Sequence, residues 1–247
     1  MLKTLRRLLS RGAPPLETTA LQQWAKERGH GWRRVRGAEG CVIDGRQGTA
    51  KWRLEWGASQ RDYIVNQELR FIAELDLPHS LLAMVLNRPL MEAMEKAVYE
   101  QLVDDVQTRI DTDTPAEMRW LVMYSKLSNP DLGRLQARYG AVSSVTPWML
   151  QWLAGPLNDA LATTIDEVPP EQPLVLTIGR GRLTLRTAMA QPNAQQLALW
   201  FSVFEHAMRE ALRLGGEWRD AAGALTTQPS AWERSELTKP NSQDGNR

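Results

Sequence analysis

The chain has 247 residues, of which 43% are hydrophobic and 24% are charged, and its formal net charge is +1. This length and composition are those of a globular protein with one large core or two small ones, which excludes a disordered or fibrous chain. The single cysteine, Cys41, excludes a disulfide framework within one chain and a zinc site built from several cysteines. No segment reaches the ~18 apolar residues that span a bilayer or has a signal-peptide core, so we expect a cytoplasmic protein.

The charge is distributed unevenly along the chain. Residues 1–36 contain nine basic and two acidic residues, whereas residues 92–117 contain two basic and eight acidic ones. The two segments could attract each other within one molecule, or they could serve two different partners. Because the sequence pI is about 7.9, no general electrostatic surface for nucleic acid is expected, and DNA or RNA binding is not predicted.

Residues 1–12 are predicted to form a short basic amphipathic helix, which Gly12 and the pair Pro14 and Pro15 end. Such a helix suits the surface of an anionic membrane, the groove of a partner protein, or the core of this protein itself. The first alternative would place the protein peripherally at the inner face of the membrane. Its apolar side consists of Leu2, Leu5, Leu8 and Leu9, and its basic side of Lys3, Arg6, Arg7 and Arg11.

Strand signals dominate from about residue 32 to residue 86. A second helix is predicted before them, over residues 17–28, with Leu21 and Trp24 on its buried face. Short strands follow at 32–36 and 41–43, and the dipeptide Asp44-Gly45 predicts a turn. In residues 49–56 polar and apolar side chains alternate, and 68–75 and 81–86 continue the pattern. The whole range predicts an antiparallel meander with one polar side.

Helix signals return in the second half of the chain, at 90–103, 115–121, 131–139 and 147–163. Residues 174–187 predict a β-hairpin, and residues 194–214 a long amphipathic helix ended by Gly215-Gly216. We therefore expect an α+β protein with a compact body over residues 17–221, as one unit or as two lobes divided near 83–89 or 169–173. Residues 222–247 are polar and are predicted to be a disordered tail.

No catalytic, metal-binding or cofactor-binding motif is recognised. The acidic residues Asp104, Asp105, Asp111 and Asp113 match no calcium loop, and Glu117 lies in the first turn of an expected helix. The histidines His30, His79 and His206 lack the spacing of zinc ligands, and Cys41 is typical of a small core residue. Serine-hydrolase, phosphate-loop and dinucleotide-binding patterns are missing. No catalytic residue, metal or cofactor is predicted.

The predicted hairpin carries three arginines, Arg180, Arg182 and Arg186, of which the last two share a strand face. Guanidinium groups at that spacing suit a phosphate, a carboxylate or an acidic partner surface, although an outer strand face is also commonly charged. The tryptophan pairs Trp52 with Trp56 and Trp148 with Trp152 share faces in a way that is typical of a core.

These features lead to two hypotheses. The first is a non-catalytic cytoplasmic protein that binds a partner protein, with transient attachment to a membrane surface through residues 1–11. The alternative is an enzyme or small-ligand binder for an anionic ligand, held by Arg180, Arg182 and Arg186 and acted on by acids of residues 104–113.

Overall fold

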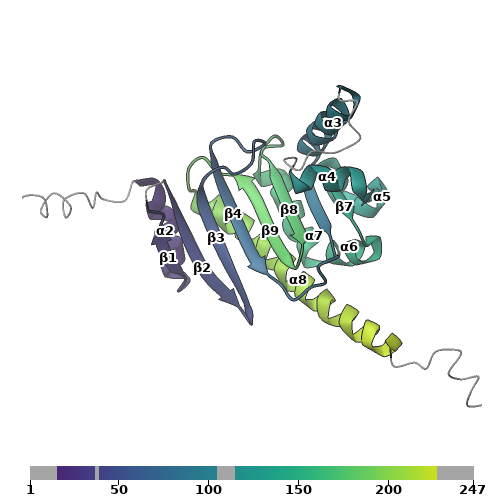
Figure 1. Cartoon of the computed structure of the whole chain (residues 1–247). Helices are drawn as coiled ribbons and strands as arrows, with labels where there is room; N and C mark the ends of the chain where they lie inside the picture. Colours follow the sequence, from purple (N-terminus) through teal and green to yellow (C-terminus); the bar gives the residue numbers. More distant parts are fainter. Residues whose placement is uncertain (1–15, 37–38, 105–114, 227–247) are drawn as a thin grey trace, which may run out of the picture.

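The computed structural model describes residues 16–36, 39–104 and 115–226 (Figure 1). Within them, nine strands form one antiparallel sheet in the order β1-β2-β3-β4-β9-β8-β5-β7-β6, which confirms the α+β class. The strands are β1 (Gly31–Arg34), β2 (Gly40–Gln47), β3 (Ala50–Ala58), β4 (Gln67–Glu74), β5 (Ala83–Asn87), β6 (Ser125–Lys126), β7 (Tyr139–Ser143), β8 (Leu174–Gly179) and β9 (Arg182–Ala188).

Helices pack on both faces of the sheet, but unequally. Four of them cover one face along its width, whereas α3 and α4 cover the other face only over β5, β7 and β8. The second face of β1–β4 and β9 has no helix over it among the residues described. The helices are α2 (Leu16–Glu27), α3 (Arg88–Asp104), α4 (Ala116–Met123), α5 (Asn129–Leu132), α6 (Thr146–Trp152), α7 (Pro156–Glu167) and α8 (Ala194–Thr226), with a 3₁₀ turn at Gly133–Ala137.

The main core lies between the sheet and helices α2, α6, α7 and α8. The predicted tryptophan pairs belong to it: Trp52 and Trp56 point inward from β3, and Trp148 and Trp152 from α6. The Trp152 indole donates a hydrogen bond to the Ala207 carbonyl of α8 at 2.9 Å, so this buried polar group is satisfied. These residues are structural.

The predicted strand at 81–86 exists as β5, but it does not extend the meander. The hairpin of β8 and β9 is inserted between β4 and β5, so that β9 pairs with β4 and β8 pairs with β5. Strands from both sides of each candidate lobe boundary therefore lie in one sheet. The hairpin itself agrees with the prediction, and its two-residue turn has positive φ at Arg180 and Gly181.

The predicted turn at Asp44-Gly45 is wrong, because β2 continues through both residues to Gln47. Gly45 lies opposite Trp52, and a Cβ at position 45 would overlap the Trp52 indole ring. The glycine therefore makes room for a core side chain, and the turn falls at Gly48, whose φ is +58°.

The predicted helix at 131–139 is also wrong in its second half. Helix α5 and the 3₁₀ turn end at Ala137, and Tyr139 begins β7, which pairs with β5. The Tyr139 ring is buried in the main core, and its hydroxyl is hydrogen-bonded to Thr164 of α7. Tertiary burial thus outweighs the local helical pattern.

The long C-terminal helix does not end at Gly215-Gly216. Helix α8 continues to Thr226, and its last part extends past the sheet (Figure 1). A Cβ at Gly215 would lie 2.5 Å from Leu77 Cδ2, so this glycine permits the helix to pass close to the β4–β5 loop. Helical residues 222–226 overlap the predicted tail, whereas residues 227–247 and the predicted helix at 1–12 lie outside the described residues.

Candidate functional site

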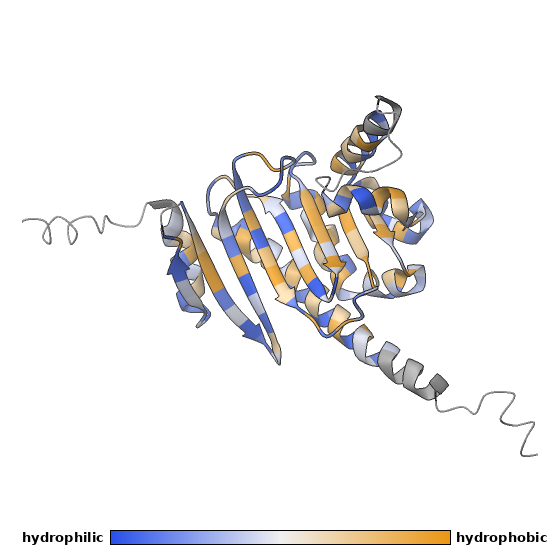
Figure 2. Cartoon of the chain, in the orientation of Figure 1, coloured by the Kyte–Doolittle hydropathy of each residue, from blue (hydrophilic) through white to orange (hydrophobic). Residues whose placement is uncertain are grey.

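The uncovered side of β1–β4 and β9, which we call the open face, carries mostly charged side chains. It arises from strand alternation: Trp52, Leu54 and Trp56 of β3 point into the core, so Lys51, Arg53 and Glu55 point outward. Figure 2 shows the same alternation of hydrophilic and hydrophobic residues along β3 and β4. The neighbouring strands add Asp44 and Arg46 (β2), Glu68, Arg70, Ile72 and Glu74 (β4), and Arg182, Thr184 and Arg186 (β9).

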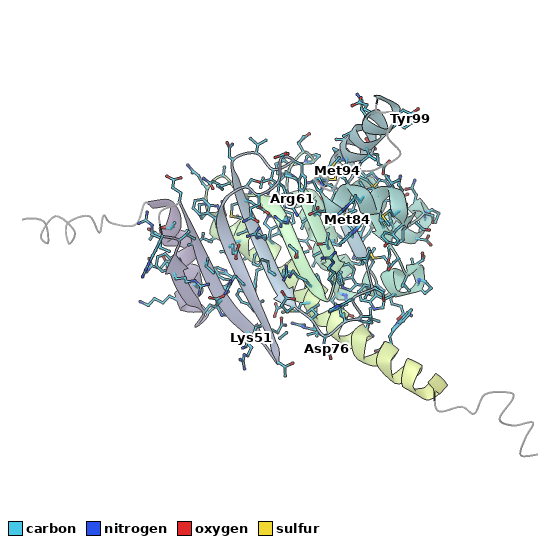
Figure 3. All side chains as sticks on the ribbon, in the orientation of Figure 1. Lys51, Arg61, Asp76, Met84, Met94 and Tyr99 are labelled. Atoms are coloured by element: carbon cyan, nitrogen blue, oxygen red, sulfur yellow. The ribbon has the colours of Figure 1, made fainter. Side chains whose placement is uncertain are left out.

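At the upper end of the open face, as drawn in Figure 3, a group of charged residues binds the β3–β4 loop to α4. Arg61 Nε donates to Glu117 Oε1 at 3.2 Å, and the Tyr63 hydroxyl donates to the same oxygen at 3.4 Å. Arg186 pairs with the buried Glu68 at 2.5 Å, and Glu68 also accepts the Gln60 backbone N–H at 3.0 Å. We call Arg61, Tyr63, Glu68, Glu117 and Arg186 the latch cluster.

The latch cluster is a structural network. Burial, with the Glu117 carboxylate nearby, raises the pKa of the Tyr63 hydroxyl far above its ordinary range. Glu117 is only 5% exposed, and its charge is balanced by Arg61. Paired and buried charges of this kind fix a loop and a helix against the sheet.

At the lower end of the open face lies a depression of about 970 Å³, which we call the basic depression. Figure 3 shows Lys51 at this end, opposite the end that carries Arg61. Five cationic and three carboxylate side chains line it, with Ile72 and the edge of Trp52 as apolar parts of its surface. The cations are Arg28, Arg46, Lys51, Arg53 and Arg182, and the carboxylates are Asp44, Glu55 and Glu74.

The structure separates the three hairpin arginines that the sequence groups together. Arg182 lines the basic depression and donates Nε to Glu74 at 2.7 Å. Arg186 belongs to the latch cluster, and Arg180 is an exposed turn residue with φ of +54°. The acidic residues 105–114 lie outside the described residues, while Glu117 occupies the first turn of α4 as predicted.

Two further candidate residues, Cys41 and His30, are packed in or against the core. Cys41 is fully buried, and burial raises the pKa of its thiol to about 11. The His30 ring packs edge-on against Trp52 with 4.7 Å between ring centroids, and burial together with Arg28 lowers its pKa. Over the described ranges, no group of three or more histidine, cysteine or acidic side chains is placed to hold a metal ion.

Sequence reasoning misses Arg46 and Lys51, the two cations that distinguish the basic depression. The period of two in residues 49–56 indicates that Lys51 points outward. Arg46 could not be assigned to a strand, because a turn was expected at Asp44-Gly45, although β2 continues and pairs Arg46 with Lys51. The pairing of β9 with β4, which adds Arg182, leaves no local signal in the sequence.

The comparisons with known proteins do not indicate a family or a function. No family model and no curated protein matches the sequence. A crystal structure of the mycobacterial trehalose monomycolate transport factor A, TtfA, has a TM-score of 0.43 and 8% sequence identity, over 76% of this chain and 90% of that chain. A similarity this low carries no argument about function. Of the helices described, none is long and apolar enough to cross a membrane.

Proposed function

We propose that this protein is a non-catalytic cytoplasmic binding protein that docks an acidic surface of a partner protein on its open face. The observation that carries the proposal is the contrast between the two halves of one sheet. Helices α3 and α4 cover β5, β7 and β8, whereas the same face of β2, β3, β4 and β9 is left to charged side chains. Broad, rigid and charged surfaces favour specific and rapid docking.

Charge indicates which kind of partner surface fits. The latch cluster is close to neutral, since its acids and arginines are paired with one another. The basic depression has two more cations than carboxylates. A complementary partner therefore presents carboxylates to the lower end of the open face.

The test is capture of the tagged protein from its native host at low salt, followed by mass spectrometry. Thr184 of β9 lies on the open face between Ile72 of β4 and Thr177 of β8, so Thr184→Glu inserts a bulky side chain with the same charge as the partner's carboxylates. Thr19→Glu makes the same substitution at an exposed position of α2 and serves as the control. We expect a stoichiometric companion with the wild type and Thr19→Glu that is lost with Thr184→Glu. Capture without a companion, or equal recovery with Thr184→Glu, rejects the proposal.

We also propose that residues 1–11 attach the protein transiently to an anionic membrane surface. The support is the sequence alone, with four leucines opposite four basic residues. Deletion of residues 1–12 should abolish co-sedimentation with vesicles that contain anionic lipid, and added salt should weaken the wild-type signal. If the shortened chain sediments equally well, the segment has another role, such as docking on a partner or on its own core.

A further inference from the structure

We propose that the basic depression is a binding site for a ligand that carries a diphosphate group. The inference goes beyond partner docking, because it concerns a small anion that the isolated protein would bind. It rests on the pairing of the charged side chains that line the depression, on the register of their strands and on the spacing between them.

The carboxylates of the depression are already engaged by cations. Asp44 accepts hydrogen bonds from Arg33 and Arg53, each at 2.8 Å. Glu74 is bound by Arg182 at 2.7 Å. Glu55 is paired with Arg70, which lies directly opposite it on β4. No lining acid is therefore left to neutralise a further cation.

Two cations have no such partner. Among the described residues, neither Arg46 nor Lys51 makes an ion pair or a side-chain hydrogen bond. They lie directly opposite each other across β2 and β3, which is an unfavourable arrangement for two like charges. Arg28 also lines the depression, but it has partners of its own, since it is paired with Glu27 at 3.9 Å and its guanidinium lies 4.7 Å from the centroid of the Trp24 ring. A bound anion would relieve the repulsion between Arg46 and Lys51.

The arginines that are paired keep hydrogen-bond donors for a ligand. Arg53 and Arg182 bind Asp44 and Glu74 through Nε, and their terminal nitrogens make no hydrogen bond within the described part of the chain. Terminal guanidinium nitrogens of this kind bind phosphate oxygens well. The carboxylates thus hold the two guanidinium groups in place while leaving their outer nitrogens available.

The spacing favours two linked phosphates over one. Arg46, Lys51 and Arg182 lie on β2, β3 and β9, with β4 between the last two. Adjacent strands are about 4.8 Å apart, so Lys51 and Arg182 emerge from the sheet about 10 Å apart. Arg46 and Lys51 can bind one phosphate, and Arg182 with Arg53 the other. The volume of the depression, about 970 Å³, leaves room for an organic group beside Ile72.

Isothermal titration of the full chain with inorganic pyrophosphate tests the proposal. Arg46→Gln and Lys51→Gln should each weaken pyrophosphate binding about tenfold, since each removes one charge-assisted contact. Lys96→Gln, at an exposed position of α3 outside the depression, should leave the affinity unchanged. Orthophosphate should bind at least tenfold more weakly than pyrophosphate.

Three results would overturn the proposal. The first is equal pyrophosphate affinity in the wild type, Arg46→Gln and Lys51→Gln, and the second is no binding at millimolar pyrophosphate. The third is that pyrophosphate raises the melting temperature of the protein no more than sodium chloride of matched ionic strength does, which would show general screening of the positive charges. Because both glutamine variants change exposed side chains and remove a like-charge repulsion, they should fold as well as the wild type.

Discussion

Gly45 and Trp52 show how one residue shapes the lower end of the open face. The Trp52 indole occupies the space next to Gly45 and packs against His30 and Phe201, so β2 can stay regular only if position 45 has no side chain. We predict that Gly45→Ala lowers the free energy of unfolding by about 1–3 kcal/mol through overpacking.

Urea unfolding would measure this effect, with Gly31→Ala as the control. A Cβ at Gly31 would meet only the Asp44 carbonyl oxygen at 3.7 Å, which is an ordinary contact. If Gly45→Ala lowers the free energy of unfolding no more than Gly31→Ala does, Gly45 is not needed to make room for the Trp52 indole.

Cys41 is predicted to be unreactive in the folded protein. Its thiol is fully buried and has a pKa raised to about 11, so almost no thiolate exists at pH 8. A thiol reagent should therefore react with Cys41 in the native protein only as fast as the fold opens. It should react immediately once urea has unfolded the protein. Rapid stoichiometric labelling of the native protein at pH 8 would contradict this assignment.

The same thiol makes stability depend on pH. The folded-state pKa is raised, so the folded state holds its proton more tightly than the unfolded state. The contribution of the protonated Cys41 thiol to the free energy of unfolding is fully present below pH ~9, which is near the ordinary thiol pKa. It is lost as the pH rises toward about 11. Cys41→Ala should flatten the fall in unfolding free energy over that range.

At the residue scale, part of the candidate site could be predicted from the sequence. The alternation in residues 49–56 identifies Lys51, Arg53 and Glu55 as one outward face, and the structure confirms the burial of their neighbours. Arg46 could not be placed, because Asp-Gly is a common turn signal. The reason for that glycine, the indole ring of Trp52, becomes visible only in three dimensions.

At the scale of the element, helix α8 contains two adjacent glycines, and substitution of each by alanine should affect stability differently. Gly216 has open space around its Cβ position, so Gly216→Ala should raise the free energy of unfolding by about 0.5–1 kcal/mol through helix propensity. Gly215→Ala should lack this gain or destabilise the protein, because Leu77 must move aside. Equal effects of the two substitutions in urea unfolding would show that α8 does not pass Leu77 as described.

The latch cluster gives a prediction for α4 and the β3–β4 loop. Glu117→Gln keeps the shape of the side chain but leaves the Arg61 guanidinium without its counter-charge, so the free energy of unfolding should fall by about 1–3 kcal/mol. A double-mutant cycle with Arg61→Gln should show coupling of about 0.5–3 kcal/mol between the two positions. Additive effects would mean that the ion pair does not hold the loop to α4.

Elements with strong local periodicity were predictable, and those determined by tertiary pairing were not. Helices α2 and α4 and the β8–β9 hairpin follow from apolar spacing and turn residues close in sequence. Strand β7 was missed because its residues Tyr139–Ser143 are all buried, so they do not alternate and only the pairing with β5 defines them.

At the scale of the whole molecule, insertion of the β8–β9 hairpin next to β4 creates the candidate site. It places Arg182 on the same face as Lys51 and Arg53, although more than a hundred residues separate them in sequence. Such a long-range arrangement leaves no local pattern, which explains why the α+β class could be predicted while the strand order could not.

The central claim is that the open face docks a partner. The most direct measurement is the dissociation constant of the purified companion for the wild type, Thr184→Glu and Thr19→Glu. We predict that affinity falls at least about tenfold for Thr184→Glu, with no change for Thr19→Glu and weaker wild-type binding as salt rises. Equal affinity of all three proteins would contradict the claim and would place the partner on another surface.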